Sequence, residues 1–182
     1  MLQIRDFADP LLNVHVKGVF FLTQTLLPQL ADGGAIVNLS TGLTRFTTLG
    51  YAAYASMKGA VEVFTKCLAK ELGSRGIKAS VVVPHIVKTD FTKAAREAHP
   101  QLEAYTSGQT ALGRISEPED IGGVVAFLCS DAARWVNAQR LEATGGYSSR
   151  PLGGRGCHQN LRPKHWRGWP APGAIPTTAP DG

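Results

Sequence analysis

The feature that most constrains the fold is a regular alternation of long helix-like stretches with short apolar runs of strand length. Apolar residues recur at helical spacing over residues 10–31, and residues 51–73 are dense in residues that favour helices. Each stretch is followed by a run too short for a helix, at residues 35–39 and 77–83. Parallel strands need such helical crossovers, so this order predicts an α/β fold with a parallel sheet covered by helices on both faces.

The alternation continues further along the chain. Residues 117–129 form a third predicted helix, because Pro118 stands near its first turn, and residues 139–143 form a last short strand. Pro10 is likewise expected in the first turn of the first helix. Between the later elements, residues 91–113 are predicted to be a mobile segment with short helices.

The apolar pattern ends after Gly146. Residues 1–147 carry 14 Lys and Arg against 13 Asp and Glu, whereas residues 148–182 carry five against one and six of the 11 prolines. We therefore predict one domain over residues 1–147 and a disordered basic tail over residues 148–182. The tail is either an extension without function, which its lack of a packing pattern favours, or a basic interaction arm. Because the predicted domain is nearly neutral, we expect no nucleic-acid partner.

Cysteine usage and hydropathy indicate the compartment. The chain has an odd number of cysteines, Cys67, Cys129 and Cys157, and none of them form a Cys-x-x-Cys motif. This usage is typical of a reducing compartment, so we predict a cytoplasmic protein. The most apolar helix-like stretch, residues 14–30, is interrupted by polar side chains and is too polar to span a bilayer. No membrane partner is expected.

Tyr54 and Lys58 are the first candidates for chemistry. They are four residues apart on a predicted helix, so their side chains share one face. A tyrosine that exchanges protons near pH 7 needs its pKa lowered by about 3 units from about 10, which is about 4 kcal/mol. An ammonium about 5.5 Å away contributes about 3 kcal/mol at an effective dielectric near 20, so we expect Lys58 to lower the pKa of Tyr54.

Several further motifs surround this pair in a fixed order. They are Ile36-Val37-Asn38-Leu39-Ser40-Thr41-Gly42, Tyr51-Ala52-Ala53-Tyr54-Ala55-Ser56-Met57-Lys58, Ala69-Lys70-Glu71-Leu72, Val83-Pro84, Thr89-Asp90-Phe91, Pro118-Glu119-Asp120-Ile121 and Gly145-Gly146. In this order and spacing the chain resembles the carboxy-terminal part of the short-chain dehydrogenases/reductases over about residues 10–147. The resemblance implies a partial Rossmann-like, doubly wound parallel sheet whose N-terminal strands are missing.

The resemblance also implies a reaction, namely hydride transfer between a nicotinamide cofactor and a small-molecule carbonyl or alcohol. Tyr54 takes the family's role of proton donor or acceptor. Lys58 takes the role of the family's lysine, which lowers the tyrosine pKa and binds the nicotinamide ribose. Thr41, 13 positions before the tyrosine, stands where the family has a serine that holds the substrate oxygen, and its hydroxyl offers the same donor and acceptor.

The family's fourth catalytic residue, an asparagine in a proton relay, is replaced by His15 in His15-Val16-Lys17-Gly18-Val19-Phe20. An imidazole also relays protons, but a histidine on a buried helix face is often structural, and both interpretations stay open. For the cofactor, the resemblance assigns Pro84, His85, the backbone of Val87, and Thr89, together with Tyr54 and Lys58. His85 stands where the family has glycine, so it adds bulk beside the cofactor.

A glycine-rich turn between a first strand and a helix, which would hold the dinucleotide pyrophosphate, is absent from the sequence. NAD and NADP therefore remain equal candidates, and we expect this chain alone to bind either weakly or not at all. One hypothesis is an oxidoreductase. The other is a truncated, catalytically inactive chain that acts through protein association. In both cases an open sheet edge predicts association, and the two long helices predict a homo-oligomer.

Metal binding is not predicted. Near His85 no second His, Cys or carboxylate stands at ligand spacing, and Cys157, His158 and His165 in the tail lack a fourth ligand.

Overall fold

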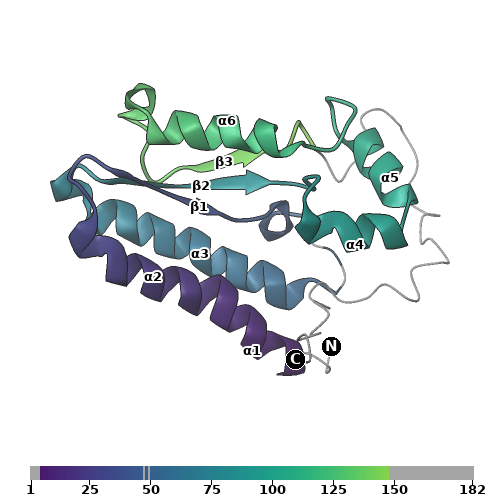
Figure 1. The fold of residues 1–182 in the computed structure, drawn as a ribbon, viewed down its shortest axis with the longest axis horizontal. Coiled ribbons are helices and arrows are strands. Elements are labelled where there is room, and N and C mark those ends of the chain that lie inside the picture. The colour runs from purple at the N-terminus through teal and green to yellow at the C-terminus, as the bar shows by residue number, and fades with distance from the viewer. Residues whose placement is uncertain (1–4, 47, 49, 148–182) are drawn as a thin grey trace, which may run out of the picture.

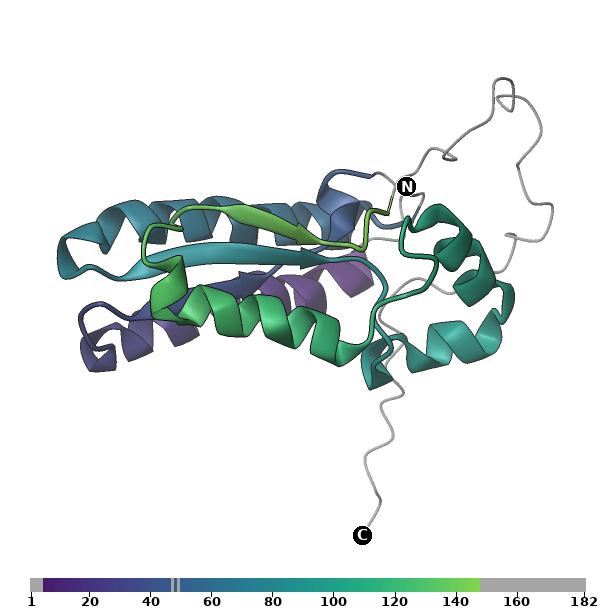
Figure 2. The same ribbon diagram turned by 90° about the horizontal axis from the view of Figure 1, so that it is seen from above.

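A computed structural model describes residues 5–147 apart from Thr47 and Leu49. Three parallel strands form one sheet in the order β1-β2-β3, with β1 at Ala35–Leu39, β2 at Lys78–Pro84 and β3 at Arg140–Ala143. Helices α1, α2 and α3 lie on one face of the sheet and α6 lies on the other (Figures 1 and 2). The predicted α/β class with a parallel sheet is therefore confirmed.

The helices follow the predicted order. The α-helices are α1 Arg5–Leu12, α2 Val19–Leu26, α3 Ala52–Glu71, α4 Asp90–Ala98, α5 Gln101–Gln109 and α6 Pro118–Cys129. A π-helical turn covers Asn13–Gly18, and 3-10 turns cover Leu27–Gln29, Gly42–Thr44, Gly73–Arg75 and Asp131–Ala133. Helices α4 and α5 are the short helices that were predicted between residues 91 and 113.

The first helix begins earlier than predicted. Pro10 is expected in the first turn, but α1 covers Arg5–Leu12 and holds Pro10 in its interior. Proline removes only its own N–H bond and strains one turn, so a helix with good packing continues past it. The π-helical turn follows immediately and ends at Gly18, where a Cβ atom would lie only 3.2 Å from the Asn13 carbonyl oxygen. Glycine therefore suits the close backbone approach in this rare type of turn.

Strand β2 lies in the centre of the sheet and is buried over residues 79–83. Because side chains alternate across a strand, Ala79 packs on the α3 side and Val82 on the α6 side. The first core includes Leu68, Ala69, Leu72 and Ile77, and the second includes Ile121, Leu128 and Ala133. These two cores fix α3 and α6 against the sheet.

Strand β1 lies at an edge. In the described part of the chain no strand pairs with its outer side, and Leu39 at its carboxyl end is 48% exposed. This is the open sheet edge that the sequence predicts.

Two findings concern the surface. None of the helices within the described residues is long and apolar enough to cross a membrane. Cys67 and Cys129 are exposed free thiols. Cys157, His158 and His165, and with them the predicted tail, lie outside the described residues. The cytoplasmic location therefore stays a prediction.

Candidate active site

The candidate residues lie together at the end of the sheet that is formed by the carboxyl ends of its strands. The carboxyl ends of parallel strands lie at the same edge, which is where α/β proteins bind ligands. Thr41 follows β1 by two residues, and Pro84 ends β2. Helix α3 runs back from this edge (Figure 1), so Tyr54 and Lys58 lie in its first two turns.

His15 and Tyr54 are in contact although 39 positions separate them. Their rings meet edge to face, with centroids 5.2 Å apart and an interplanar angle of 81°. His15 belongs to the π-helical turn and Tyr54 to α3, so the helices before and after β1 bring the two together. The structure thus groups the predicted relay residue with the predicted acid.

Lys58 is the third member of this group. Its Nζ lies 5.9 Å from the centroid of the Tyr54 ring and donates a hydrogen bond of 3.0 Å to the carbonyl oxygen of Leu39. Burial lowers the pKa of Lys58, and burial followed by the charge of Lys58 lowers the pKa of His15. Both shifts favour the neutral forms, as expected where solvation is weak.

The pKa of Tyr54 is raised, first by burial and then by the neighbouring Tyr51. This net shift is opposite in direction to the one expected from Lys58 alone. The physical reason is that burial disfavours the charged phenolate. Tyr54 is therefore protonated at neutral pH, which is the form that donates a proton.

Thr41 and Ser40 both carry hydroxyls in the segment after β1, but their surroundings differ. Ser40 is 6% exposed, and its Oγ donates to Glu62 Oε1 at 2.6 Å. Thr41 Oγ1 accepts a long hydrogen bond of 3.4 Å from the Leu43 N–H. Accepting this bond does not use the hydroxyl proton of Thr41, which can still be donated. The geometry favours Thr41 over Ser40 as a ligand of a substrate oxygen.

The side chain of His85 contacts Tyr147, the last residue that the structure describes. Its ring lies 3.5 Å from that of Tyr147, centroid to centroid, and burial lowers its pKa to about 4. Gly42 lies against the same turn, because a Cβ atom there would be 3.9 Å from the Pro84 oxygen and 4.0 Å from His85 Cδ2. The loop after β1 and the turn after β2 are therefore neighbours.

Val87 and Thr89 lie in the turn that leads into α4. Val87 forms a parallel bridge with Ser116, and its carbonyl oxygen accepts a 2.6 Å hydrogen bond from Thr92 Oγ1. The Thr89 N–H donates to the same Thr92 oxygen at 3.4 Å, as part of a capping box. The sequence does not indicate this role of Thr92, because the usual capping-box signal has Glu or Gln at that position.

These groups fit one end of a nicotinamide cofactor. A half-buried lysine and hydroxyls at the carboxyl edge of a parallel sheet suit the nicotinamide and its ribose. The bulk of His85 is directed at Tyr147. Among the described residues, no glycine-rich turn leads from a strand into a helix, so the phosphate-binding end has no counterpart there. The same residues contain no cluster of three or more His, Cys, Asp or Glu able to hold a metal ion.

Comparison with known proteins gives the same picture. A family model described as Enoyl-(Acyl carrier protein) reductase matches residues 3–148. The chain is 42% identical over 134 residues to an uncharacterized oxidoreductase of Methylorubrum extorquens, covering 74% of this chain and 54% of that protein.

Solved structures are similar over the same part of the chain. A short-chain dehydrogenase/reductase from Brucella melitensis, described as SDR:Glucose/ribitol dehydrogenase, has 31% identity and a TM-score of 0.69, covering 74% of this chain and 54% of that one. The angucycline C-6 ketoreductase LanV with bound NADP has 33% identity and a TM-score of 0.71, covering 78% and 54%. The chain thus spans about half the length of these relatives. With the family match, these likenesses show that the chain belongs to the short-chain dehydrogenase/reductase family of oxidoreductases.

Proposed function

We propose that this chain supplies the catalytic half of an NAD(P)-dependent oxidoreductase that interconverts a small-molecule carbonyl and its alcohol. The observation that carries the proposal is the cluster of His15, Tyr54 and Lys58 at the carboxyl edge of the sheet. Similarity to a ketoreductase with bound NADP supports a nicotinamide cofactor. NAD and NADP both remain candidates.

Tyr54 is the proposed acid in the direction of reduction. A reduced nicotinamide supplies a hydride to the carbonyl carbon when bound. The Tyr54 hydroxyl gives its proton to the carbonyl oxygen, which becomes the alcohol, and Tyr54 is left as phenolate. The ammonium of Lys58, about 6 Å from the ring, stabilises that phenolate by about 3 kcal/mol at an effective dielectric near 20. In alcohol oxidation each step runs backward.

The remaining residues hold the reactants. Thr41 is proposed to donate its hydroxyl proton to the substrate oxygen and so to orient the carbonyl toward Tyr54. Neutral His15, next to the phenol ring, is proposed to pass a proton from solvent back to the phenolate. Lys58 would hold the ribose hydroxyls. Pro84, His85, Val87 and Thr89 would line the nicotinamide side of the site.

The experiment is a chimera in which residues 10–147 replace the matching half of LanV, so that the phosphate-binding half is provided. We expect NADPH-dependent reduction of one or more ketones in a panel, and a loss of about a thousandfold in Y54F. Equal rates in the chimera and in Y54F would contradict the role of Tyr54. The control variant Y105F changes a tyrosine on α5 that is 55% exposed.

A second candidate function is association without catalysis. The unpaired outer side of β1 and the exposed apolar side chains Phe21, Leu22 and Leu26 on α2 favour it. The two functions differ in outcome. A chimera that binds NADPH in a fluorescence titration but reduces none of the ketones would favour association, whereas turnover lost in Y54F would favour the enzyme.

A further inference from the structure

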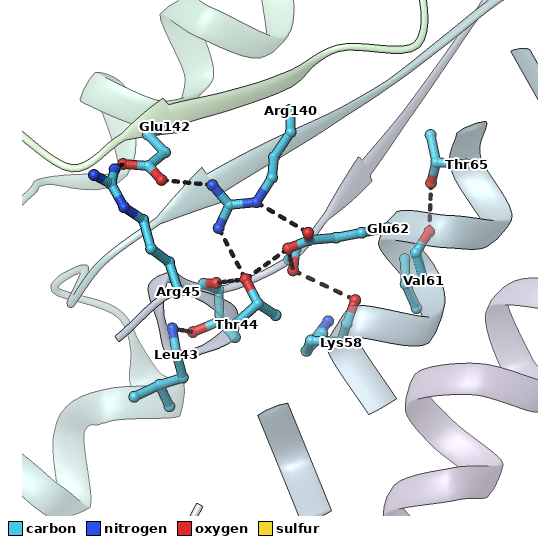
Figure 3. A network of polar contacts seen from close by, with 11 residues as sticks. Leu43, Thr44, Arg45, Lys58, Val61, Glu62, Thr65, Arg140 and Glu142 are labelled. Carbon is cyan, nitrogen blue, oxygen red and sulfur yellow. Dashed lines mark hydrogen bonds and ion pairs between the residues drawn. The ribbon is translucent and has the colours of Figure 1, made fainter. Parts of the chain in front are cut away.

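A second polar cluster lies one helical turn beyond Lys58, centred on the carboxylate of Glu62. Glu62 belongs to α3, but its side chain is only 12% exposed, which is unusual for a glutamate. It points at the loop that follows β1 (Figure 3). A buried carboxylate is costly unless charge and hydrogen bonds compensate it, so its partners indicate what holds it there.

Glu62 forms hydrogen bonds with the loop on both sides of Thr41. Its Oε1 accepts 2.6 Å and 2.8 Å hydrogen bonds from Ser40 Oγ and Thr44 Oγ1, respectively. Thr44 Oγ1 also lies 2.9 Å from the Thr41 carbonyl oxygen. One carboxylate oxygen therefore fixes the residue before Thr41 and the 3-10 turn after it, which defines where the Thr41 backbone runs.

Arg140, on β3, supplies the compensating charge. Its Nε donates to Glu62 Oε2 at 2.9 Å and its Nη2 donates to Thr44 Oγ1 at 2.8 Å. Thr44 Oγ1 accepts from Arg140, so its one proton is left to donate to either the Thr41 carbonyl oxygen or Glu62 Oε1. The charged Glu62 oxygen is the nearer of the two acceptors, at 2.8 Å against 2.9 Å. Glu142 pairs with Arg140 at 2.5 Å and with Arg45 at 2.7 Å, which balances two carboxylates against two guanidinium groups.

We infer that Glu62, held by Arg140, is a positioning residue that fixes the loop of residues 40–46 so that the Thr41 hydroxyl meets the substrate oxygen beside Tyr54. The inference rests on the proposed function for its catalytic consequence, but the positioning is a property of the chain itself. It joins three segments far apart in the sequence, since 22 positions separate Glu62 from Ser40 and 78 separate it from Arg140.

The first measurement is amide hydrogen exchange in the full chain, which does not depend on activity. The 3-10 turn protects the Arg45 and Phe46 amides, which both donate to the Gly42 carbonyl at 2.9 Å. In E62Q we expect exchange of these amides to rise about tenfold, which corresponds to about 1.4 kcal/mol. Exchange in residues 79–83 of β2 should not change. Unchanged exchange at Arg45 and Phe46 would overturn the inference.

Two further variants make the test robust. T44V removes one hydroxyl that Glu62 holds while keeping side-chain size, so it should raise the same exchange even if E62Q folds poorly. D32N is the matched control, because it breaks the Asp32–Arg75 ion pair of 2.8 Å in a turn next to Gly33, before β1. D32N should leave the exchange of residues 40–46 at the wild-type rate. A rise in D32N equal to that in E62Q would show a general loosening and overturn the inference.

The second measurement separates positioning from mere structural support. In the LanV chimera, E62Q should lower kcat about tenfold while leaving KM for NADPH within about twofold, because the loop carries Thr41 and not the cofactor contacts. Faster loop exchange with unchanged kcat would overturn the positioning role. If the parent chimera is inactive, the proposed function fails, and the exchange data alone then decide whether Glu62 holds the loop.

Discussion

The imidazole of His15 meets the phenol ring of Tyr54 edge to face, with 5.2 Å between ring centroids, at the point where the family has asparagine. His15 lies in the π-helical turn Asn13–Gly18 and not in a regular α-helix. Because burial and Lys58 lower the pKa of His15, the ring is neutral near pH 7 and offers one donor and one acceptor. That is the requirement for a relay.

From this follows a prediction for His15. In the LanV chimera, H15L should lower kcat about a hundredfold, because leucine can neither donate nor accept a proton. H15N should keep most of the rate, since an amide orders water in the same place. The wild-type kcat should fall in acid with a midpoint below 6.5, and this limb should vanish in H15N. An identical acid limb in wild type and H15N would rule out His15 as the relay.

His85 gives a prediction about stability. Its folded-state pKa is about 4, against an ordinary value of 6.5, so between these values the unfolded chain binds a proton that the folded chain does not. The free energy of unfolding should therefore fall as the pH drops from about 6.5 to about 4, by as much as about 3 kcal/mol. Above pH 6.5 the contribution is fully present.

The measurement is the urea midpoint of wild type and H85F from pH 4 to 7.5. Phenylalanine keeps a ring against Tyr147 but does not titrate, so H85F should lose most of this pH dependence. The lowered pKa of His15 acts in the same direction, and H15N measures its share. Asp120, whose pKa is about 2, contributes only at lower pH. Equal slopes in wild type and H85F would contradict the assignment.

Local signals in the sequence predict much of this fold. The short runs that became β1 and β2 are apolar and bounded by turn residues, and α3 and α6 begin within a residue of their predicted starts. Tyr54 and Lys58 are near each other because the helix repeat places them there. The start of α1 was mispredicted, because Pro10 is a strong local signal that the continuing helix overrides.

Contacts across the sheet are what the sequence does not reveal. Glu62 and Arg140 look like ordinary surface residues of a helix and a strand, and only the fold places them 2.9 Å apart with most of both side chains buried. The spacing of Tyr54 and Lys58 likewise gives their proximity on the helix but not the burial that raises the pKa of Tyr54. The contact between the His85 and Tyr147 rings similarly depends on β2 and β3 ending side by side.

Gly146 gives a prediction about the fold near the site. Its φ is 76°, and a Cβ atom would lie 2.8 Å from the Cβ of Ala111. G146A should lower the free energy of unfolding by about 2 to 3 kcal/mol, because it combines a left-handed backbone with a close contact. G122A is the matched control. Gly122 lies within α6 with open space around it, so alanine there should stabilise by about 0.5 to 1 kcal/mol. If both variants shift the urea midpoint equally, the close approach is not the cause.

The last prediction concerns self-association through α2 and α3. Phe21 and Leu22 on α2 and Val63 on α3 are 55%, 61% and 61% exposed, which is a large apolar surface for two neighbouring helices. We predict a homo-oligomer that buries this surface, because apolar surface of this kind favours association. Replacing Leu22 by glutamate places a charge on this surface and should shift the sedimentation coefficient toward the monomer.

The control for L22E is W135E, which changes a side chain that is 96% exposed and lies outside α2 and α3, in the loop between α6 and β3. Monomers in L22E and oligomers in W135E would assign the interface to α2 and α3. The reverse result would assign it to the surface around Trp135. Oligomers in both variants would point to an outer strand of the sheet, β1 or β3, where backbone groups bind a second strand regardless of these side chains. Proline in place of Val37 would then test the edge at β1, because it removes an N–H from β1.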